Sequence, residues 1–334
     1  MASSRVLPAS YNTHTFGTVG AGRDYQSIAT WESDHTIDLS IADKGEVLDC
    51  YDDAASFDQS GITIAGATNS TATRFRLIRA PSGQCHDGTP NNGFTIASSV
   101  AAIGIVLNEN YAQVWDLIEI KTLNSASSYN CIALDGTNAK AIGCITKCTN
   151  AGTGAGRGIA LDQYSTYAIN CLAYECKTFG FQTWVTAGIT NYIYNCTAIN
   201  CGKGFEVLGA AGGTVVVTNC IGQDNASGDF LKGANVTATV TYCLSKDATA
   251  DDWGGAGNLI SKDLTFANEA GDDWHLAYTD TDAIGAGTDL SGTFDDDIDF
   301  QTRAGTWDIG FDEYCSPLKK SVNSLGSNAN VMTG

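Results

Sequence analysis

Tyr167-Ala-Ile-Asn-Cys-Leu-Ala-Tyr174 and Tyr192-Ile-Tyr-Asn-Cys-Thr-Ala-Ile199 are two copies of one short sequence pattern. A dipeptide that ends in cysteine occurs at five places, as Gly143-Cys144, Asn170-Cys171, Asn195-Cys196, Asn219-Cys220 and Tyr242-Cys243. The steps between these cysteines are 27, 25, 24 and 23 residues. A period in this range is typical of solenoid proteins, in which each repeat packs only against its neighbours.

The residues within each copy indicate β-strands. Short runs alternate between apolar and polar or small residues, and Gly, Asn, Asp and Ser separate them. Residues 60–265 show neither a sustained helical face nor the leucine-rich repeat pattern. The sequence therefore predicts an all-β parallel β-helix with coils of about 22–27 residues. Coils stacked about 4.8 Å apart let each backbone pair with the coils on either side.

The residues around the repeat divide the chain of 334 residues into five parts. Asp24 is expected to cap a short helix that carries Tyr25, Ile28 and Trp31 as an apolar stripe. This helix would close the first coil, which otherwise exposes an open strand edge. Short strands are expected at residues 45–51, 61–65 and 75–80. The predicted parts are an N-terminal arm at 1–15, an N-terminal cap at 16–58, the parallel β-helix at 59–265, a C-terminal closing segment at 266–315 and a tail at 316–334.

Twelve cysteines are many for a chain without an evident export signal. Cysteines in the same phase of successive coils are expected to point into the interior, where a free thiol behaves as a small apolar group. An alternative is that some form disulfides, and Cys50, Cys85 and Cys315 lie outside the repeat and would be the first to pair. Zinc is disfavoured because no histidine lies between residues 87 and 274.

Motifs at both ends resemble a known family. Asp273-Trp-His-Leu276, Ala283-Ile-Gly-Ala-Gly287 and Asp308-Ile-Gly-Phe-Asp-Glu-Tyr314 resemble the closing segment of right-handed parallel β-helix proteins of the pectin-lyase-like superfamily. Val19-Gly-Ala-Gly-Arg-Asp-Tyr-Gln-Ser-Ile28 is similar to their N-terminal cap. The resemblance implies a right-handed parallel β-helix with a helical cap and a closing segment. It leaves the function open, since that superfamily includes lyases, hydrolases, esterases, phage tailspikes and structural rods.

Two acids of the repeat are the candidate catalytic residues. Asp135 and Asp162 occupy the same repeat phase, so stacked coils would hold their carboxylates about 5 Å apart, as in a retaining glycosidase. Glu206 sits one position off that phase. The alternative is that each acid only ends a strand at a turn. The Asp-Asp and His-Gly pairs of polygalacturonases and the Arg-x-Pro-x-x-Arg of pectate lyases are absent.

The acidic loop near the C-terminus is the candidate metal site. Asp295, Asp297 and Asp299 are the candidate calcium ligands, because alternate carboxylates in a loop can bind this ion. The alternative is a solvated turn in which Arg303 pairs with an aspartate. His275 is interpreted as a packed residue of the closing segment rather than as a catalytic base. We expect no cofactor and no bound metal.

Charge and segment composition limit the partners. A formal net charge of −19 argues against nucleic acid and against an anionic membrane. The first residues lack an apolar signal region, and no stretch of 18 apolar residues is present. We therefore expect a protein made in a cytoplasm, with a virion as its final location. An extracellular or cell-surface location reached without the Sec route is the alternative.

The expected function is a non-enzymatic structural β-helix displayed on a bacteriophage particle, as a capsid decoration or a tail-associated protein. Residues 1–15 and 316–334 would dock it onto other virion proteins or onto further copies of itself in a homo-oligomer. Removal of residues 1–12 is expected to leave the melting temperature nearly unchanged. The alternative is a β-helix that binds or degrades polysaccharide, as a lyase or a glycoside hydrolase, with a cell-surface glycan as its ligand.

Overall fold

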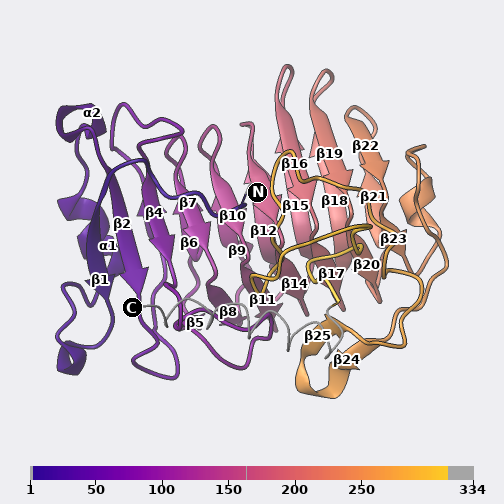
Figure 1. Ribbon diagram of the computed structural model, residues 1–334, viewed down its shortest axis with the longest axis horizontal. Coiled ribbons are helices and arrows are strands. Elements are labelled where there is room, and N and C mark those ends of the chain that lie inside the picture. Colours follow the sequence, from indigo (N-terminus) through magenta and orange to yellow (C-terminus); the bar gives the residue numbers. More distant parts are fainter. Residues whose placement is uncertain (1–2, 163, 315–334) are drawn as a thin grey trace, which may run out of the picture.

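The protein is a parallel β-solenoid of about eight turns, and the computed structural model describes residues 3–162 and 164–314 (Figure 1). A complete turn contributes one strand to each of three parallel sheets. The first sheet contains β1 (Tyr11–Phe16), β2 (Gly45–Cys50), β4 (Arg76–Arg79), β7 (Gln113–Trp115), β10 (Lys140–Ile142), β13 (Tyr167–Ile169), β16 (Thr190–Tyr194), β19 (Thr214–Thr218) and β22 (Thr237–Thr241). The second contains β5 (Thr95–Ser98), β8 (Ile118–Leu123), β11 (Ile145–Asn150), β14 (Leu172–Tyr174), β17 (Thr197–Ile199), β20 (Ile221–Gln223) and β23 (Leu244–Ser245). The third contains β3 (Ile62–Ile64), β6 (Ile105–Leu107), β9 (Tyr129–Leu134), β12 (Gly156–Asp162), β15 (Phe179–Val185), β18 (Lys203–Gly209) and β21 (Phe230–Lys232).

The remaining elements are short and lie near the two ends of the solenoid. They are α1 (Ile28–Asp34), α2 (Leu39–Ala42), the 3₁₀ turns η1 (Val19–Ala21), η2 (Thr249–Asp251) and η3 (Glu269–Gly271), and the antiparallel pair β24 (Phe266–Asn268) and β25 (Asp273–Leu276). The predicted parallel β-helix is thus confirmed, and the strands expected at 45–51, 61–65 and 75–80 are β2, β3 and β4. No helix of the described ranges is both long and apolar enough to span a membrane.

One residue per turn, at the corner between the first and second sheets, has a left-handed backbone conformation. Asparagine adopts this conformation more readily than most residues, which explains its repetition before the cysteine. The φ angles lie between 50° and 61° at Asp116, Gly143, Asn170, Asn195, Asn219 and Tyr242. Asp116 extends the repeat one turn further toward the N-terminus than the cysteine pattern indicated.

The cysteine that follows each corner residue from Gly143 to Tyr242 points into the interior, as predicted. The Sγ of Cys196 accepts a hydrogen bond from the backbone N–H of Cys171 at 3.4 Å, and Cys220 does the same for Cys196 at 3.5 Å. All cysteines of the described residues have free thiols, and only Cys85 among them is not buried. Cys50 and Cys85 are therefore unpaired, while Cys315 lies outside the described residues.

Aromatic rings fill the same interior from the third sheet. Phe181, Phe205 and Phe230 stack nearly parallel on successive turns, with ring centroids 5.0 and 4.8 Å apart. Parallel in-register strands place equivalent side chains directly above one another, so each ring covers the faces of its neighbours. The interior of the later turns therefore contains columns of identical or similar residues.

The N-terminal segment is part of the solenoid, which corrects two predictions. β1 begins at Tyr11 and pairs with β2, so the sheet starts inside the expected arm 1–15 and well before residue 59. The side chain of Ser27, not that of Asp24, caps α1 by accepting a hydrogen bond from Thr30 N at 3.2 Å. Asp24 instead accepts hydrogen bonds from Thr15 of β1.

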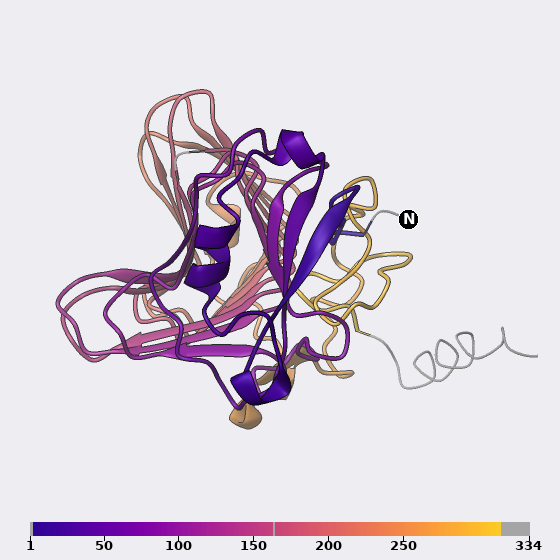
Figure 2. The same ribbon diagram turned by 90° about the vertical axis from the view of Figure 1, so that its left-hand side faces the viewer.

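The C-terminal segment runs back along the outside of the solenoid (Figures 1 and 2). Its residues Trp274, Ile309 and Phe311 cover the outward apolar side chains of the second sheet, such as Leu172 and Ile199. A further cluster on the first sheet gathers Phe294 and Trp307 over Trp115, Ile142 and Ile169. These two clusters give the solenoid a second apolar core outside its sheets.

Arg5 joins the beginning of the chain to this C-terminal segment. Its guanidinium forms ion pairs with Asp116 at 2.7 Å and with Asp296 at 2.9 Å. A Cβ on Gly143 would lie 2.2 Å from the Arg5 guanidinium, so only glycine at this corner leaves room for it. The expectation that residues 1–12 add little to the fold is therefore wrong, since deleting them removes this cluster and the start of β1.

Candidate functional site

The two candidate catalytic acids lie side by side at the outer edge of the third sheet. Leu134 pairs with Leu161 in the register of β9 and β12, so the residues that follow them, Asp135 and Asp162, occupy equivalent places on adjacent turns. Both carboxylates line one cavity of ≈ 260 Å³, together with Asn108 and Tyr164. The structure therefore brings the predicted pair together.

The environment of the pair raises the pKa of both carboxyl groups. Burial, followed by the negative charge of Asp135, raises the pKa of Asp162 to about 6. Burial also raises the pKa of Asp135, whose Oδ1 has no hydrogen-bond partner among the described residues. A carboxyl group with a pKa near 6 can donate a proton near neutral pH, while a second, ionised carboxylate can act as a nucleophile or base.

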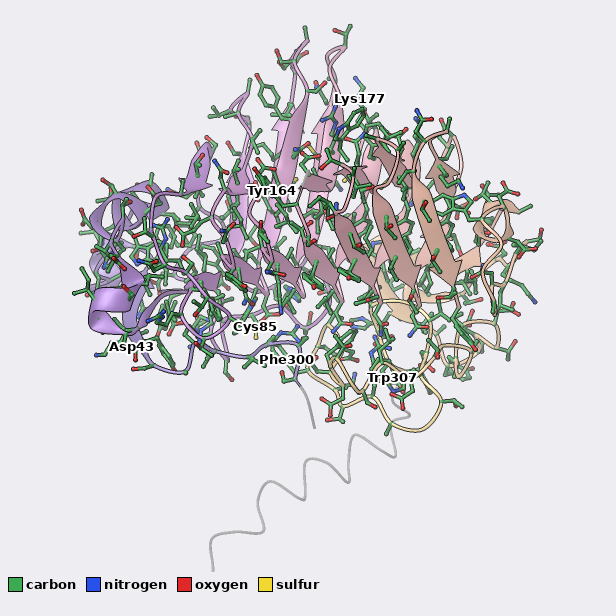
Figure 3. The ribbon with its side chains drawn as sticks, turned by 90° about the horizontal axis from the view of Figure 1, so that it is seen from above. Asp43, Cys85, Tyr164, Lys177, Phe300 and Trp307 are labelled. Atoms are coloured by element: carbon green, nitrogen blue, oxygen red, sulfur yellow. The ribbon has the colours of Figure 1, made fainter. Side chains whose placement is uncertain are left out.

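Aromatic side chains next to the pair are exposed. Trp184 pairs directly with Asp162 in the register of β12 and β15, and its side chain is 48% exposed. Tyr164 is 45% exposed at the rim of the cavity. Figure 3 places Tyr164 on a different side of the solenoid from Phe300 and Trp307 of the C-terminal segment. Carboxylates flanked by exposed rings form a surface on which a sugar ring can stack.

Glu206 belongs to a different part of the third sheet. It pairs in register with Gln182, which pairs with Ala160, so it lies two turns away from Asp162 and two positions earlier along the strand, not one position off as the sequence suggested. Its carboxylate is held by Lys203 at 2.5 Å and by Gln182 at 2.7 Å. Glu206 is therefore occupied in a local ion pair and is not part of the candidate catalytic pair.

The acidic loop forms a second group of carboxylates. Carboxylate oxygens of Asp297, Asp299 and Asp312 lie within 4.8 Å of one another. The third member of the group is therefore Asp312, and not Asp295 as the sequence suggested. Asp299 and Asp312 line a cavity of ≈ 330 Å³, which His275 and Asp87 also border. The three carboxylates could hold a hard cation such as calcium, which prefers oxygen ligands.

Protonation can also relieve the repulsion within this group. Burial, then the neighbouring charge of Asp299, raises the pKa of Asp297 well above its usual range, and burial raises that of Asp312 to about 6. Burial alone would lower the pKa of His275, but Asp312 and a 2.6 Å hydrogen bond to Asp273 raise it. A proton on Asp297 would reduce the repulsion within the group, as a bound cation would.

The rest of the loop differs from the solvated turn expected as the alternative. Asp295, Asp296 and Asp297 are buried, and Arg303 pairs with Glu313 at 3.2 Å rather than with an aspartate side chain. Sequence reasoning missed Asp312 because it lies 13 residues after Asp299 in the sequence, outside the aspartate run, although the fold brings the two carboxylates together. Its position in the motif Asp308-Ile-Gly-Phe-Asp-Glu-Tyr314 was the only signal that could have indicated it.

No protein-family model, curated protein or solved structure matches this chain. The resemblance of the terminal motifs to the pectin-lyase-like superfamily therefore stays a prediction, and the fold alone does not assign an activity.

Proposed function

We propose that this protein is a non-enzymatic structural rod displayed on a bacteriophage particle, as a capsid decoration or a tail-associated protein. One observation carries the proposal: residues 3–5 and residues 313–314 meet at the same place on the flank of the solenoid. Asp296 accepts hydrogen bonds from Ser4 N at 3.0 Å and from Arg5, while Asp297 accepts one from Glu313 N at 3.0 Å.

This convergence supports attachment through one flank. The tail 316–334 lies outside the described residues, but it follows Tyr314 and so starts from this place. The polar tail carries Lys319 and Lys320 on a chain of net charge −19, which suits a docking segment for an acidic partner surface or for a further copy of the protein. Residues 3–5 contribute to this flank through their contacts with Asp296, and residues 11–15 belong to β1 rather than to a free arm.

Deletion of residues 318–334 tests the proposal. We expect the truncated protein to keep its melting temperature, because the apolar clusters of the described residues lie outside the deleted segment, which is mostly polar. It should fail to sediment with phage particles or to form the oligomer of the full chain in light scattering. A tail of the same composition in scrambled order is the control for length and charge. Normal assembly of the truncated chain would refute attachment through the tail.

The second candidate function is the binding or cleavage of a polysaccharide on the third sheet. It is favoured by the shared cavity of Asp135 and Asp162, the raised pKa of Asp162 and the exposed Trp184 beside it. The Asp135→Asn, Asp162→Asn double variant should lose any cleavage of acidic or neutral polysaccharides, while Trp184→Ala should weaken binding. Glu175→Gln, at an exposed acid of another corner, is the matched control. Cleavage by the wild type that depends on the pair would replace the structural proposal.

A further inference from the structure

Two histidines and a glutamate meet at the N-terminal end of the solenoid, where α1 lies across the opening (Figure 2). His14 is on β1, Glu46 is the second residue of β2, and His35 directly follows α1. One ligand atom from each of these side chains lies within 4.8 Å of the others. Two imidazole nitrogens and one carboxylate oxygen from separate parts of the chain thus lie close to one point.

The hydrogen bonds around the three side chains already orient them. The Nδ1–H of His35 donates to the carbonyl of Trp31 at 2.7 Å, which leaves Nε2 as the nitrogen with a free lone pair. A backbone carbonyl on the far ring nitrogen is the usual partner of a metal-binding histidine, because it fixes the tautomer and the ring direction. Glu46 is held by Asn12 Nδ2 at 2.7 Å and by His14 Nε2 at 2.8 Å.

Packing limits the movement of the rings. The His14 and His35 rings lie 4.1 Å apart between centroids, Trp31 stacks on His35, and Tyr25 meets both rings edge-on. Glu46 is 1% exposed, so its charge is shielded from water. Arg76, its neighbour in the register of β2 and β4, is ion-paired with Glu109 and Glu32 and does not form an ion pair with Glu46 among the described contacts.

From this geometry we infer that His14, His35 and Glu46 form a binding site for a divalent transition metal, with Zn²⁺ as the fitting ion. Two imidazoles and one carboxylate are a known zinc donor set, which leaves a fourth position for water. His14 borders an open cavity of ≈ 620 Å³ with Tyr25 and Asp34, so that position faces solvent. On binding, the metal takes the place of the proton between His14 Nε2 and Glu46, and this proton moves to Nδ1 or leaves to solvent.

The site would tie β1, α1 and β2 together at the open end of the solenoid. It is independent of the proposed docking flank and of the acid pair on the third sheet. A purely structural hydrogen-bond cluster would show the same contacts but would gain no stability from added metal, and this difference is what the experiment measures.

Titration of EDTA-treated full-length protein with Zn²⁺ in a calorimeter tests the inference. We expect one tight equivalent, a higher melting temperature with zinc, and the visible absorption of four-coordinate cobalt when Co²⁺ replaces it. Glu46→Gln and His14→Gln should each lower zinc affinity at least about tenfold, since even the loss of an outer partner costs about 10–100-fold. The zinc-induced rise in melting temperature should also disappear in both variants, whatever their melting temperature without metal.

Asp299→Asn is the matched control, because it alters the other group of candidate metal ligands. Its zinc affinity should equal that of the wild type. The inference is overturned if wild-type protein binds no zinc, if Glu46→Gln and His14→Gln bind it as tightly as the wild type, or if Asp299→Asn abolishes binding.

Discussion

The interior of the later turns and the interior of the first turns are held together in different ways. From residue 131 onward, columns of Cys, Ile and Phe repeat in register, and each side chain packs on its own counterpart. The first turns also have an apolar interior, but they enclose charged residues as well. Arg76 is fully buried and pairs with Glu109, while Glu119 and Lys121 are buried with no hydrogen-bond partner for their charged atoms among the described residues.

This difference shows that one backbone arrangement tolerates two kinds of interior. A repeated apolar column needs only a fixed register, because any two neighbouring turns present the same surfaces. A buried ion pair needs partners from several segments, and Arg76 draws its partners from α1, from the residue after β3 and from the residues before β7. The first turns depend on specific pairs, whereas the later turns depend on repetition.

Cys196→Asp should have the largest effect. It places an unpaired carboxylate in an apolar column, and we expect a loss of at least about 4 kcal/mol in the free energy of unfolding. Cys196→Ala, which leaves only a small cavity, should cost about 1 kcal/mol. Urea denaturation followed by circular dichroism measures both. Similar stabilities of the two variants would mean that the column tolerates charge as the first turns do.

Glu109→Ala should come next. Without this partner the buried Arg76 guanidinium keeps the more exposed Glu32 carboxylate and the backbone carbonyls of Glu32, His35 and Ala65. Loss of one member of a buried pair costs about 3–5 kcal/mol. Glu175→Ala breaks a partly exposed pair with Lys147 and should cost at most about 1 kcal/mol. Equal losses from these two substitutions in chemical denaturation would contradict the special role of the buried pair.

Arg5→Ala should have an intermediate effect, since it removes the charge that joins Asp116 to Asp296. We expect a loss of about 2–3 kcal/mol, the range for hydrogen bonds to charged groups. Arg23→Ala, which breaks an ion pair with Asp53 at the N-terminal end, is the control and should cost less. Hydrogen exchange should show faster opening of residues 290–314 in Arg5→Ala only.

Asp162→Asn should stabilise the protein slightly at neutral pH. The folded pKa of about 6 lies above the usual value of 3.8, so the folded state binds more protons and wild-type stability falls as pH rises from about 4 to 6. The Asn variant does not titrate, so its stability does not fall over this pH range. We expect its free energy of unfolding at pH 7 to exceed that of the wild type by roughly 1 kcal/mol after allowing for partial exposure. Thermal melts at pH 4 and pH 7 measure it. A gain that is as large at pH 4 would exclude the titration as its cause.

The smallest expected change is in thiol reactivity. Burial raises the pKa of the Cys196 thiol and also blocks reagent access, so the ladder cysteines should not react with iodoacetamide in the native protein. Cys85, which is only partly buried, should react, and all of the ladder thiols should react in urea. Rapid native labelling of Cys171, Cys196 or Cys220, detected by mass spectrometry, would contradict their inward orientation.

The repeated features of the structure could be predicted from the sequence, whereas contacts that occur only once could not. The inward thiols and the Asp135 and Asp162 pair followed from spacing alone, because in-register stacking turns a repeat phase into a spatial column. The Arg5 cluster, the Ser27 cap and the place of Asp312 follow from contacts between segments that share no repeat. The corner at Asp116 could have been predicted from the sequence, since Asp116 lies 27 residues before Gly143. It was missed because leucine rather than cysteine follows it.

The contacts of Arg5 also set an order of events during synthesis. Arg5 and Asp116 are 111 residues apart in the sequence, whereas Arg5 and Asp296 are 291 residues apart. At about 5–20 residues per second, a ribosome needs roughly 15–60 s to reach Asp296 after Arg5. During that interval the growing chain can add turns one at a time onto an N-terminal end that is already paired. Residues 264–314 then cover the flank and close the cluster, so the fold can be completed only after these residues have been made.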